Sequence, residues 1–420
     1  MFKKIVFKNK LRAIICPMRS TRSVTVLILV GAGTKYERKK ENGISHFLEH
    51  MCFKGTKKRP HALQIAKEIE GVGGVMNAFT GKDFTGYFVK VDFPHFELAL
   101  DVVSDIFLHP LLKEEEIEKE RGVILEEIKM IEDNPREYVE YLFEKLLYGD
   151  QPAGWQITGT RETVMQIKRK NLLNYIKRFY VASNTIVGIA GRVDVKKANI
   201  LIQKYFSEIK DKPPGRKKRV KERQNVFKTL FFKKDTKQSH LAFGVRTFNL
   251  FHKDRYTLSL LATILGGNMS SRLFQELREK RGLAYYIATL SEVNPDTGYL
   301  VTYTGVDHKK VKDVVKLIFE EYQKIKDKGV KEEELFQAKE YLKGRLRLSL
   351  EDSESVASFY GMQELLENKI LTPEEKIKEI EKVKTEDIKR VANEICLLYT
   401  SDAADDGESV DLGGRRIIKK

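Results

Sequence analysis

Residues 43–51 have the sequence Gly-Ile-Ser-His-Phe-Leu-Glu-His-Met, in which two histidines stand four positions apart and a glutamate precedes the second. Positions i, i+3 and i+4 of an α-helix lie on one face, so a helix here points His46, Glu49 and His50 in one direction. Two imidazoles one turn apart can bind one divalent cation, and zinc accepts nitrogen ligands in that geometry. Glu49 stands where it can reach a water on the ion, which is the position of a general base.

The order H-x-x-E-H is typical of inverted-motif zinc peptidases. Two histidines at this spacing also occur as a surface pair or as buried, hydrogen-bonded side chains, so five residues alone leave both interpretations open. A zinc site needs a third ligand, and a charged helix predicted at residues 113–134 offers candidates. Glu120 and Glu127 are two turns apart and share a face of that helix, whereas Glu126 points about 100° away from Glu127.

Short strands and helices surround the motif. Apolar and alternating patterns predict, in the first half, strands at 2–8, 11–16, 23–30, 76–80, 84–91 and 184–190, and helices at 61–71, 93–109, 113–134, 136–147 and 163–180. The second half repeats this order, with strands at 229–233, 239–247, 285–292 and 298–306, helices at 254–265 and up to 281, and long helices to 395. We therefore expect an α+β fold of two homologous domains, each an antiparallel-rich sheet covered by helices.

A composition change separates the two halves. Residues 210–219, Lys-Asp-Lys-Pro-Pro-Gly-Arg-Lys-Lys-Arg, combine prolines, a glycine and a basic run. They predict a linker at 211–224 between a first domain at 1–210 and a second at 225–395. The basic run could bind an acidic partner, but a solvated linker is the commoner role of such a segment.

The last residues do not continue the pattern. Residues 396–420 resemble the translation of a transposase-type sequencing-library adapter, which implies an artefactual tail. Residues 385–395 resemble residues 169–179, which precede the strand at 184–190. We therefore expect the second domain to lack its matching last strand.

The composition excludes several classes. No run of 18 apolar residues occurs among the 420, and Cys16, Cys52 and Cys396 make no disulfide framework, so we expect a cytoplasmic protein without membrane contact. The first eight residues lack the long apolar region of a signal peptide. The net charge of +16 could indicate nucleic-acid binding, but the lysines alternate with glutamates along helices. A solvated basic surface is therefore the favoured interpretation, without nucleic acid as a partner.

The motif and the distal glutamates together resemble the pitrilysin/insulinase family of zinc metallopeptidases, in its half-length bacterial and mitochondrial-processing-peptidase-like subfamily. That family's pattern has H-x-x-E-H, then 76 residues, then a ligating glutamate, and 76 residues separate His50 from Glu127 here. The resemblance covers residues 1 to about 395. It implies one zinc ion per chain, held by His46, His50 and Glu127, with Glu120 orienting a ligand histidine.

The resemblance also implies where a substrate binds. Asn77, Ala78, Phe79 and Thr80 resemble the edge strand that pairs with the peptide, although a plain hairpin strand would have the same sequence. Residues 277–285, Leu-Arg-Glu-Lys-Arg-Gly-Leu-Ala-Tyr, resemble a segment whose arginine and tyrosine contact the substrate backbone and the oxyanion, here Arg278 and Tyr285. A helix-capping arginine and a core tyrosine are the structural alternative for these two.

The resemblance predicts a zinc endopeptidase in which Glu49 is the base, acting on peptides or unfolded segments inside a chamber formed by a homodimer, or by a heterodimer with a related subunit. Two other functions compete with it. A non-catalytic or partner-dependent subunit of a heterodimeric processing peptidase would lack an intact zinc motif, whereas this chain has one. A basic nucleic-acid-binding protein would bind without cleaving peptides and would release at modest salt.

Overall fold

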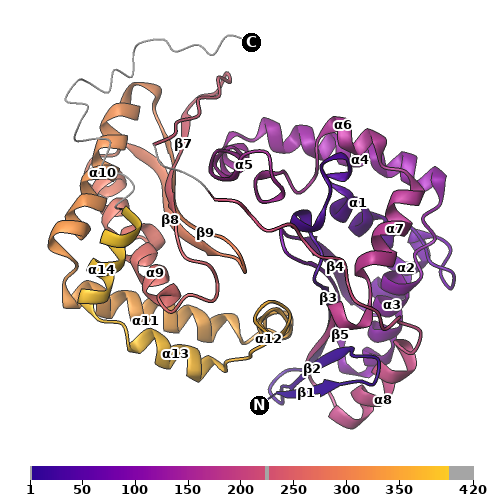
Figure 1. The fold of residues 1–420 in the computed structure, drawn as a ribbon. Coiled ribbons are helices and arrows are strands. Elements are labelled where there is room, and N and C mark those ends of the chain that lie inside the picture. The colour runs from indigo at the N-terminus through magenta and orange to yellow at the C-terminus, as the bar shows by residue number, and fades with distance from the viewer. Residues whose placement is uncertain (1, 223–226, 397–420) are drawn as a thin grey trace. The chain divides into compact units, whose positions relative to one another are not determined.

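The computed structural model describes residues 2–222 and 227–396, and its contacts divide the chain into two compact units (Figure 1). The N-terminal unit consists of residues 1–134, 148–220 and 344–373. The C-terminal unit consists of residues 135–147, 221–343 and 374–420. The division falls inside the predicted linker, but each unit also includes a segment from the other half of the chain. No helix in the described part of the chain is long and apolar enough to cross a membrane.

A six-stranded sheet forms the middle of the N-terminal unit. Its strands are β1 (Lys3–Val6), β2 (Arg12–Pro17), β3 (Ser23–Val30), β4 (Val75–Thr80), β5 (Thr85–Asp92) and β6 (Thr185–Gly191). Their order is β1-β2-β6-β3-β5-β4, and every pair is antiparallel except β2 with β6. The central strands β3 and β6 are apolar and buried along almost their whole length. Burial on both faces explains why they carry continuous apolar runs rather than alternating ones.

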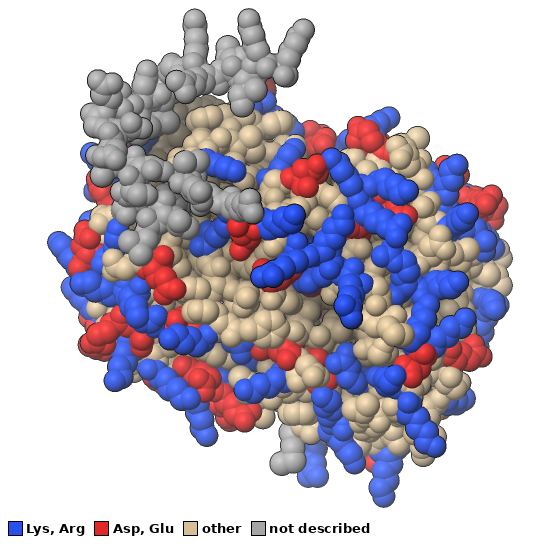
Figure 2. All heavy atoms as spheres, viewed as in Figure 1, with Lys and Arg blue, Asp and Glu red and all other residues tan. Residues whose placement is uncertain are grey.

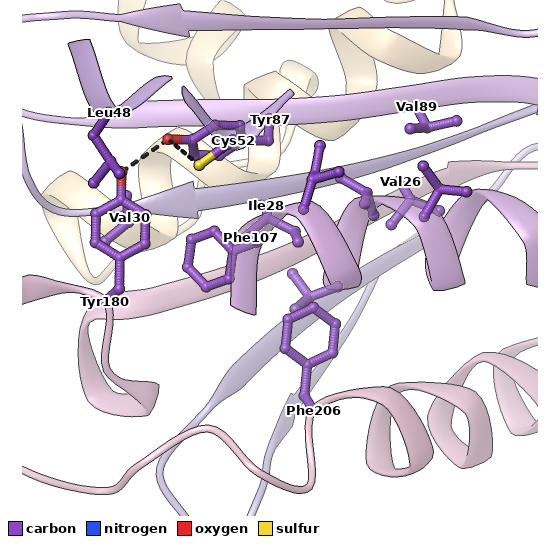
Figure 3. Close-up of a cluster of buried hydrophobic side chains, with 14 of the residues drawn as sticks. Val26, Ile28, Val30, Leu48, Cys52, Tyr87, Val89, Phe107, Tyr180 and Phe206 are labelled. Atoms are coloured by element: carbon purple, nitrogen blue, oxygen red, sulfur yellow. Dashed lines mark hydrogen bonds between the residues drawn. The ribbon is translucent and has the colours of Figure 1, made fainter. Parts of the chain in front are cut away.

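One face of this sheet is covered by helices that follow the strands in the chain. They are α1 (Ile44–Cys52), α2 (Ala62–Glu70), α3 (Phe96–Leu108), α4 (Glu114–Asp133), α6 (Arg161–Gln166), α7 (Arg169–Phe179) and α8 (Val195–Tyr205). Figure 3 shows Leu48 of α1 and Phe107 of α3 packed beside Ile28 and Tyr87 of the sheet. The Tyr87 hydroxyl lies 2.8 Å from that of Tyr180, so this core also satisfies its buried polar atoms.

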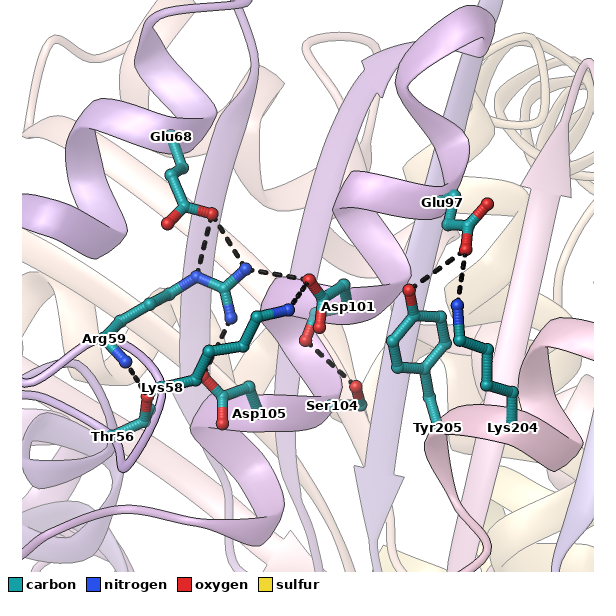
Figure 4. Close-up of polar contacts among 10 residues, drawn as sticks. All are labelled: Thr56, Lys58, Arg59, Glu68, Glu97, Asp101, Ser104, Asp105, Lys204 and Tyr205. Atoms are coloured by element: carbon teal, nitrogen blue, oxygen red, sulfur yellow. Dashed lines mark hydrogen bonds and ion pairs between the residues drawn. The ribbon is translucent and has the colours of Figure 1, made fainter.

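A buried arginine fastens the loop after α1 to the helices of this layer. The Arg59 guanidinium bonds to Glu68 of α2 at 2.8 Å and to Asp101 and Asp105 of α3 at 2.9 and 2.8 Å (Figure 4). Thr56 donates to the same Asp105 carboxylate at 2.5 Å. With three carboxylates around it, the buried charge is compensated, and α1, α2 and α3 are held in one arrangement.

The single helix predicted at 163–180 is wrong, because two helices, α6 and α7, occupy these residues. The buried Arg121 side chain bonds to the carbonyl oxygens of Val164 and Ile167, which satisfies the end of α6 where a continuing helix would need amide donors. The Lys168 amide donates to the Asn171 side chain at 2.9 Å and starts α7. Helix α8 was not predicted from the sequence.

The opposite face of the sheet is covered by α12 (Ser353–Glu367), which comes from the second half of the chain. Ser353 bonds to Thr25 of β3 at 2.8 Å, and Ala357 packs against Gly188 of β6, where a Cβ would lie 3.2 Å from the Ala357 carbonyl oxygen. At the other end of α12, the fully buried Glu364 carboxylate binds Arg12 at 3.1 Å and Lys4 at 2.7 Å. This pairing connects α12 to β1 and β2.

The C-terminal unit has the same plan around a smaller sheet. Its described strands, β7 (Ser239–Arg246), β8 (Ala284–Val293) and β9 (Gly298–Val306), are antiparallel in the order β7-β9-β8. Its helices are α9 (Arg255–Ala262), π-helical stretches at Thr263–Gly267 and Phe274–Glu279, α10 (Val311–Lys328), α11 (Glu332–Ser349), α13 (Pro373–Glu381) and α14 (Thr385–Cys396). Helix α5 (Pro135–Tyr148), from the first half, packs Phe143 against Tyr299 and Tyr303 of β9. The predicted fold of two related α+β units is confirmed.

The strand predicted at 229–233 is wrong, since these residues form no ladder and Phe231 is 81% exposed. Its counterpart β2 is paired in parallel with β6. No described residue forms the strand that would correspond to β6, so residues 229–233 have no neighbour to join. The expected loss of the last strand and the artefactual tail concern residues 396–420, which lie outside the described residues except for Cys396 at the end of α14.

Replacing Glu364 by glutamine should destabilise the N-terminal unit by about 2 kcal/mol, because Arg12 and Lys4 lose their buried partner. Urea denaturation followed by tryptophan fluorescence would measure the effect. The matched control is Glu351→Gln, an exposed position just before α12. Equal midpoints for both variants would show that the pairing does not hold α12 in place.

Candidate metal centre

The N-terminus of α1 is fixed by a turn and a buried carboxylate. Gly43 has φ 92°, and a Cβ there would lie 2.5 Å from the Thr158 carbonyl oxygen, so both the backbone angle and the space require glycine. The Glu37 carboxylate accepts hydrogen bonds from the amides of Gly43 and Ser45 at 2.8 and 2.9 Å and from the Ser45 hydroxyl at 2.6 Å. It thus satisfies the amides of the first turn that have no helical partner. Burial raises the pKa of Glu37 despite these bonds.

The two faces of α1 have different surroundings. Phe47, Leu48 and Met51 are fully buried in the core of the N-terminal unit. His46 and His50 lie on the face toward α4, and α1 also contacts β4. Because the apolar face can be buried in only one orientation, core packing aims the histidines at the distal glutamates.

Three donor atoms meet between α1 and α4. The Nε2 atoms of His46 and His50 are 3.2 Å apart, and Glu127 oxygens lie 3.5 Å from His46 Nε2 and 3.7 Å from His50 Nε2. These three residues are the only group in the described chain whose His, Cys, Asp or Glu ligand atoms gather closely enough to hold a metal ion. Ligands at about 2.05 Å in a tetrahedron lie about 3.3 Å from one another, so the spacing fits zinc.

The residues around the donors orient them for a cation. His50 Nδ1 lies 2.8 Å from Glu120 Oε1, which leaves Nε2 as the metal-facing nitrogen. Burial acts to raise the pKa of Glu120, but its contacts with His50 and Lys54 keep that pKa below the usual range. The hydrogen bond with His46 lowers the pKa of Glu127, which favours the charged form that binds metal. His46 Nδ1 is buried and has no hydrogen-bond partner among the described residues.

Glu49 lies beside the three donors, but its carboxylate is hydrogen-bonded to a residue outside this group. Its carboxylate accepts a hydrogen bond from the Thr80 hydroxyl at the end of β4. Burial is the largest cause that raises the pKa of Glu49 above its ordinary value. A carboxyl group that binds protons more readily than usual, one residue from a metal ligand, is suited to accept and return a proton. Thr80 was predicted in the edge strand, but its contact with Glu49 was not, although Thr80 shares a strand face with Met76 and Ala78, which contact the α1 side.

Strand β4 is the last strand of its sheet, so its outer edge is free of other described strands. Asn77, Ala78 and Phe79 lie on this edge strand in register with Phe88, Tyr87 and Gly86 of β5. Phe79 packs over Gly86, where no side chain would fit. The outer edge of β4 is therefore open to pairing with an extended peptide near the Glu49 side of α1, where the Ala78 amide now donates to the Asn77 side chain at 2.8 Å.

Arg278 and Tyr285 belong to the C-terminal unit. The Arg278 guanidinium lies 5.9 Å from the centre of the Tyr285 ring, and Tyr285 is 74% exposed. The tyrosine is therefore not the core residue that the structural alternative required. The two side chains lie together on the surface of their own unit.

Two family models match the chain. Insulinase (Peptidase family M16) matches residues 14–161, and Peptidase M16 inactive domain matches residues 166–342. A protein of Bacillus subtilis named as the uncharacterized zinc protease YmxG is 36% identical over 404 residues, which cover 96% of this chain and 97% of that protein. The chain belongs to peptidase family M16.

Other M16 relatives agree in length and fold. An uncharacterized zinc protease of Rickettsia felis is 35% identical over 94% of this chain and 95% of its own length. The crystal structure of a protease from Helicobacter pylori superposes with a TM-score of 0.89 at 26% identity, over 94% of this chain and 96% of that one. A Pseudomonas fluorescens structure described as a peptidase M16 inactive domain shares the fold with a TM-score of 0.86 at 17% identity, over 94% and 95%.

Replacing Glu127 by glutamine should weaken zinc binding by about 100-fold or more, because even a residue that only supports a metal ligand contributes about 10–100-fold. Competition of the purified protein with a chromophoric chelator would measure the dissociation constant. The matched control is Glu126→Gln, one position away on α4, where the carboxylate pairs with Lys129 at 2.6 Å. If Glu126→Gln lost zinc and Glu127→Gln kept it, the ligand assignment would be wrong.

Proposed function

We propose that this M16 chain is a zinc-dependent endopeptidase. The observation that carries the proposal is the meeting of His46, His50 and Glu127 at tetrahedral spacing, with the carboxylate of Glu49 directly beside them. The names of the M16 relatives as zinc proteases support the same metal and the same class of reaction.

Each residue of the site has a separate role in peptide hydrolysis. Zinc held by this triad would supply a water whose pKa falls to about 7 and a Lewis acid for the scissile carbonyl. The Glu49 carboxylate would accept a proton from the attacking water and return it to the amine that leaves. Thr80 holds the Glu49 carboxylate in place through its hydroxyl. Glu120 keeps the His50 ring in the orientation that ligation needs.

The free edge of β4 supports an extended peptide as the substrate. A peptide paired with Asn77, Ala78 and Phe79 gains backbone hydrogen bonds that do not depend on its sequence. Because Thr80 continues that strand and contacts Glu49, a peptide paired with β4 would lie beside Glu49, the proposed base. Such pairing needs an extended chain, so we infer that peptides or unfolded segments are cut, and folded domains are not.

We further propose that the site is completed by a second chain. Arg278 and Tyr285 are surface residues suited to bind a peptide backbone and an oxyanion. In a homodimer, or a heterodimer with a related subunit, each chain would offer this pair to its partner's metal centre, around a chamber that admits flexible peptides.

The alternative is a non-catalytic subunit of a heterodimeric processing peptidase. The match of residues 166–342 to a model described as an inactive domain favours this alternative for the second half of the chain. The metal triad and Glu49 lie in the other matched segment, residues 14–161, and their presence favours the catalytic function.

Replacing Glu49 by glutamine should leave zinc at one equivalent per chain and lower peptide hydrolysis by about 10²–10⁴-fold, the usual contribution of a general base. Metal analysis and a fluorogenic peptide assay on the same sample would measure both. Glu70→Gln, an exposed change at the end of α2, is the control. Full zinc with near-normal hydrolysis in Glu49→Gln would contradict the role of the base.

Mixing inactive Glu49→Gln with inactive Tyr285→Phe should restore activity if the site is shared between chains. Random exchange makes half of the dimers mixed, each with one intact site, so about a quarter of wild-type activity should return. Exchange of subunits would be verified with two affinity tags, and each variant mixed with itself is the control. A mixture that exchanges but remains inactive would show that the site is not completed in trans.

A further inference from the structure

Six cations on and beside the linker of the N-terminal unit are called the basic linker surface here: Lys177, Lys210, Lys212, Arg216, Lys218 and Arg219. Four of them belong to the linker, which the sequence suggested would be solvated. Figure 2 shows Lys and Arg gathered over the stretch where the linker crosses this unit in Figure 1.

The linker is fastened across one end of the six-stranded sheet. The Lys210 carbonyl accepts a hydrogen bond from the Ala182 amide at 3.0 Å, and the Ser183 hydroxyl donates to the Lys212 carbonyl at 3.0 Å. Further along, the Gly215 amide donates to the Arg178 carbonyl at 2.9 Å. These contacts lie along the end of α7 and the start of β6. They hold the linker backbone in place, so its cations occupy defined positions.

The linker then reaches the turn beside the candidate metal centre. Lys217 forms an ion pair with the buried Asp83, whose other oxygen lies 2.9 Å from the buried Lys35 ammonium. Asp83 lies in the turn that directly follows Thr80, and Thr80 bonds to Glu49. The anchored linker therefore borders the end of β4 at which the base is held.

The cations of the basic linker surface are poorly compensated, because Asp211, the one acid in residues 210–219, pairs with Lys10 at 3.2 Å instead. None of its six cations forms an ion pair with a described carboxylate, whereas Lys119 and Lys129 of α4 each bind a glutamate three residues away. Burial, and the like charges of Lys177 and Lys210, lower the pKa of Lys212. Crowded cations without acids repel one another, and a bound anion would relieve that repulsion.

We propose that the basic linker surface selects peptide substrates that carry Asp or Glu on the side of the scissile bond that extends beyond Thr80. This inference rests on the proposed peptidase function and names its substrate class. A peptide paired with β4 leaves the strand at the turn of residues 81–83, where the linker lies. The binding of a nucleic acid is less favoured, because residues 207–221 contain no aromatic side chain on which bases could stack.

The test uses the zinc-loaded protein and one cleavable core peptide. The core is flanked on its N-terminal or its C-terminal side by four Glu, four Gln or four Lys residues, and kcat/KM is measured for each at 0.05 and 0.5 M salt. We expect a Glu block on one of the two sides to raise kcat/KM about tenfold over Gln, as charge steering does, and 0.5 M salt to remove the difference.

A quadruple variant identifies the cations responsible. It carries Lys212→Gln, Arg216→Gln, Lys218→Gln and Arg219→Gln. The ratio of its kcat/KM for the Glu peptide to its kcat/KM for the Gln peptide should fall to about one, since four uncompensated charges are gone. The matched control removes four exposed lysines elsewhere on the same unit, Lys57→Gln, Lys67→Gln, Lys196→Gln and Lys197→Gln, and should keep the wild-type ratio.

The outcomes separate the two proposals. Equal kcat/KM for Glu and Gln peptides in the wild type, or equal loss of the preference in both quadruple variants, would overturn the inference and leave the peptidase function standing. Cleavage of none of the peptides would overturn the peptidase function and the inference with it. If a single-stranded oligonucleotide of equal charge bound the surface more tightly than the Glu peptide, and only in the wild type and the control, the surface would be a nucleic-acid site and the inference would be wrong.

Discussion

The burial of the apolar face of α1 is the constraint on which the candidate site depends. Phe47, Leu48 and Met51 are buried between the sheet and the neighbouring helices. Their burial turns the opposite face of α1 toward α4 and β4. The histidines and Glu49 occupy that opposite face because of helical spacing alone. A rotation of α1 by one residue, about 100°, would expose core side chains and separate the donor atoms at the same time. Hydrophobic packing and metal geometry are therefore satisfied by the same orientation.

Electrostatics sets a second condition. Two imidazoles are surrounded by the carboxylates of Glu49, Glu120 and Glu127, all at least partly buried, and only Glu120 has a lysine partner, Lys54 at 2.6 Å. A divalent cation among these groups offsets their repulsion and desolvation. Charge is organised differently at the adjoining linker, where the six cations form no ion pairs with described carboxylates. We propose that the N-terminal unit thus combines an anionic site for a metal with a cationic surface for a substrate at the same end of β4.

Local patterns predicted most of the fold and of the site. The strands β3 and β5, the helix α1 and the paired glutamates of α4 follow from periodicity within short windows. Periodicity left Glu120 and Glu127 as candidates, and the family resemblance, through its 76-residue spacing, implied Glu127 as the third donor. Contacts between distant segments were not predictable in this way. Arg121 breaks the helix expected at 163–180 through carbonyl groups more than 40 positions away. Helix α5 packs in the C-terminal unit and α12 in the N-terminal unit, each away from its own half of the chain. Which sheet each helix covers cannot be predicted from the sequence of the helix. The contact of Thr80 with Glu49 was missed because it is a single hydrogen bond between residues on different elements.

Zinc titration of the metal-free chain, with peptide hydrolysis as the readout, tests the central claim most directly. The account predicts no hydrolysis without metal, a rise in proportion to added zinc, and a plateau at one equivalent per chain, since the described residues hold one such cluster of donors. Hydrolysis by the metal-free chain, or one tightly bound equivalent of zinc with no hydrolysis of any peptide tested, would contradict it.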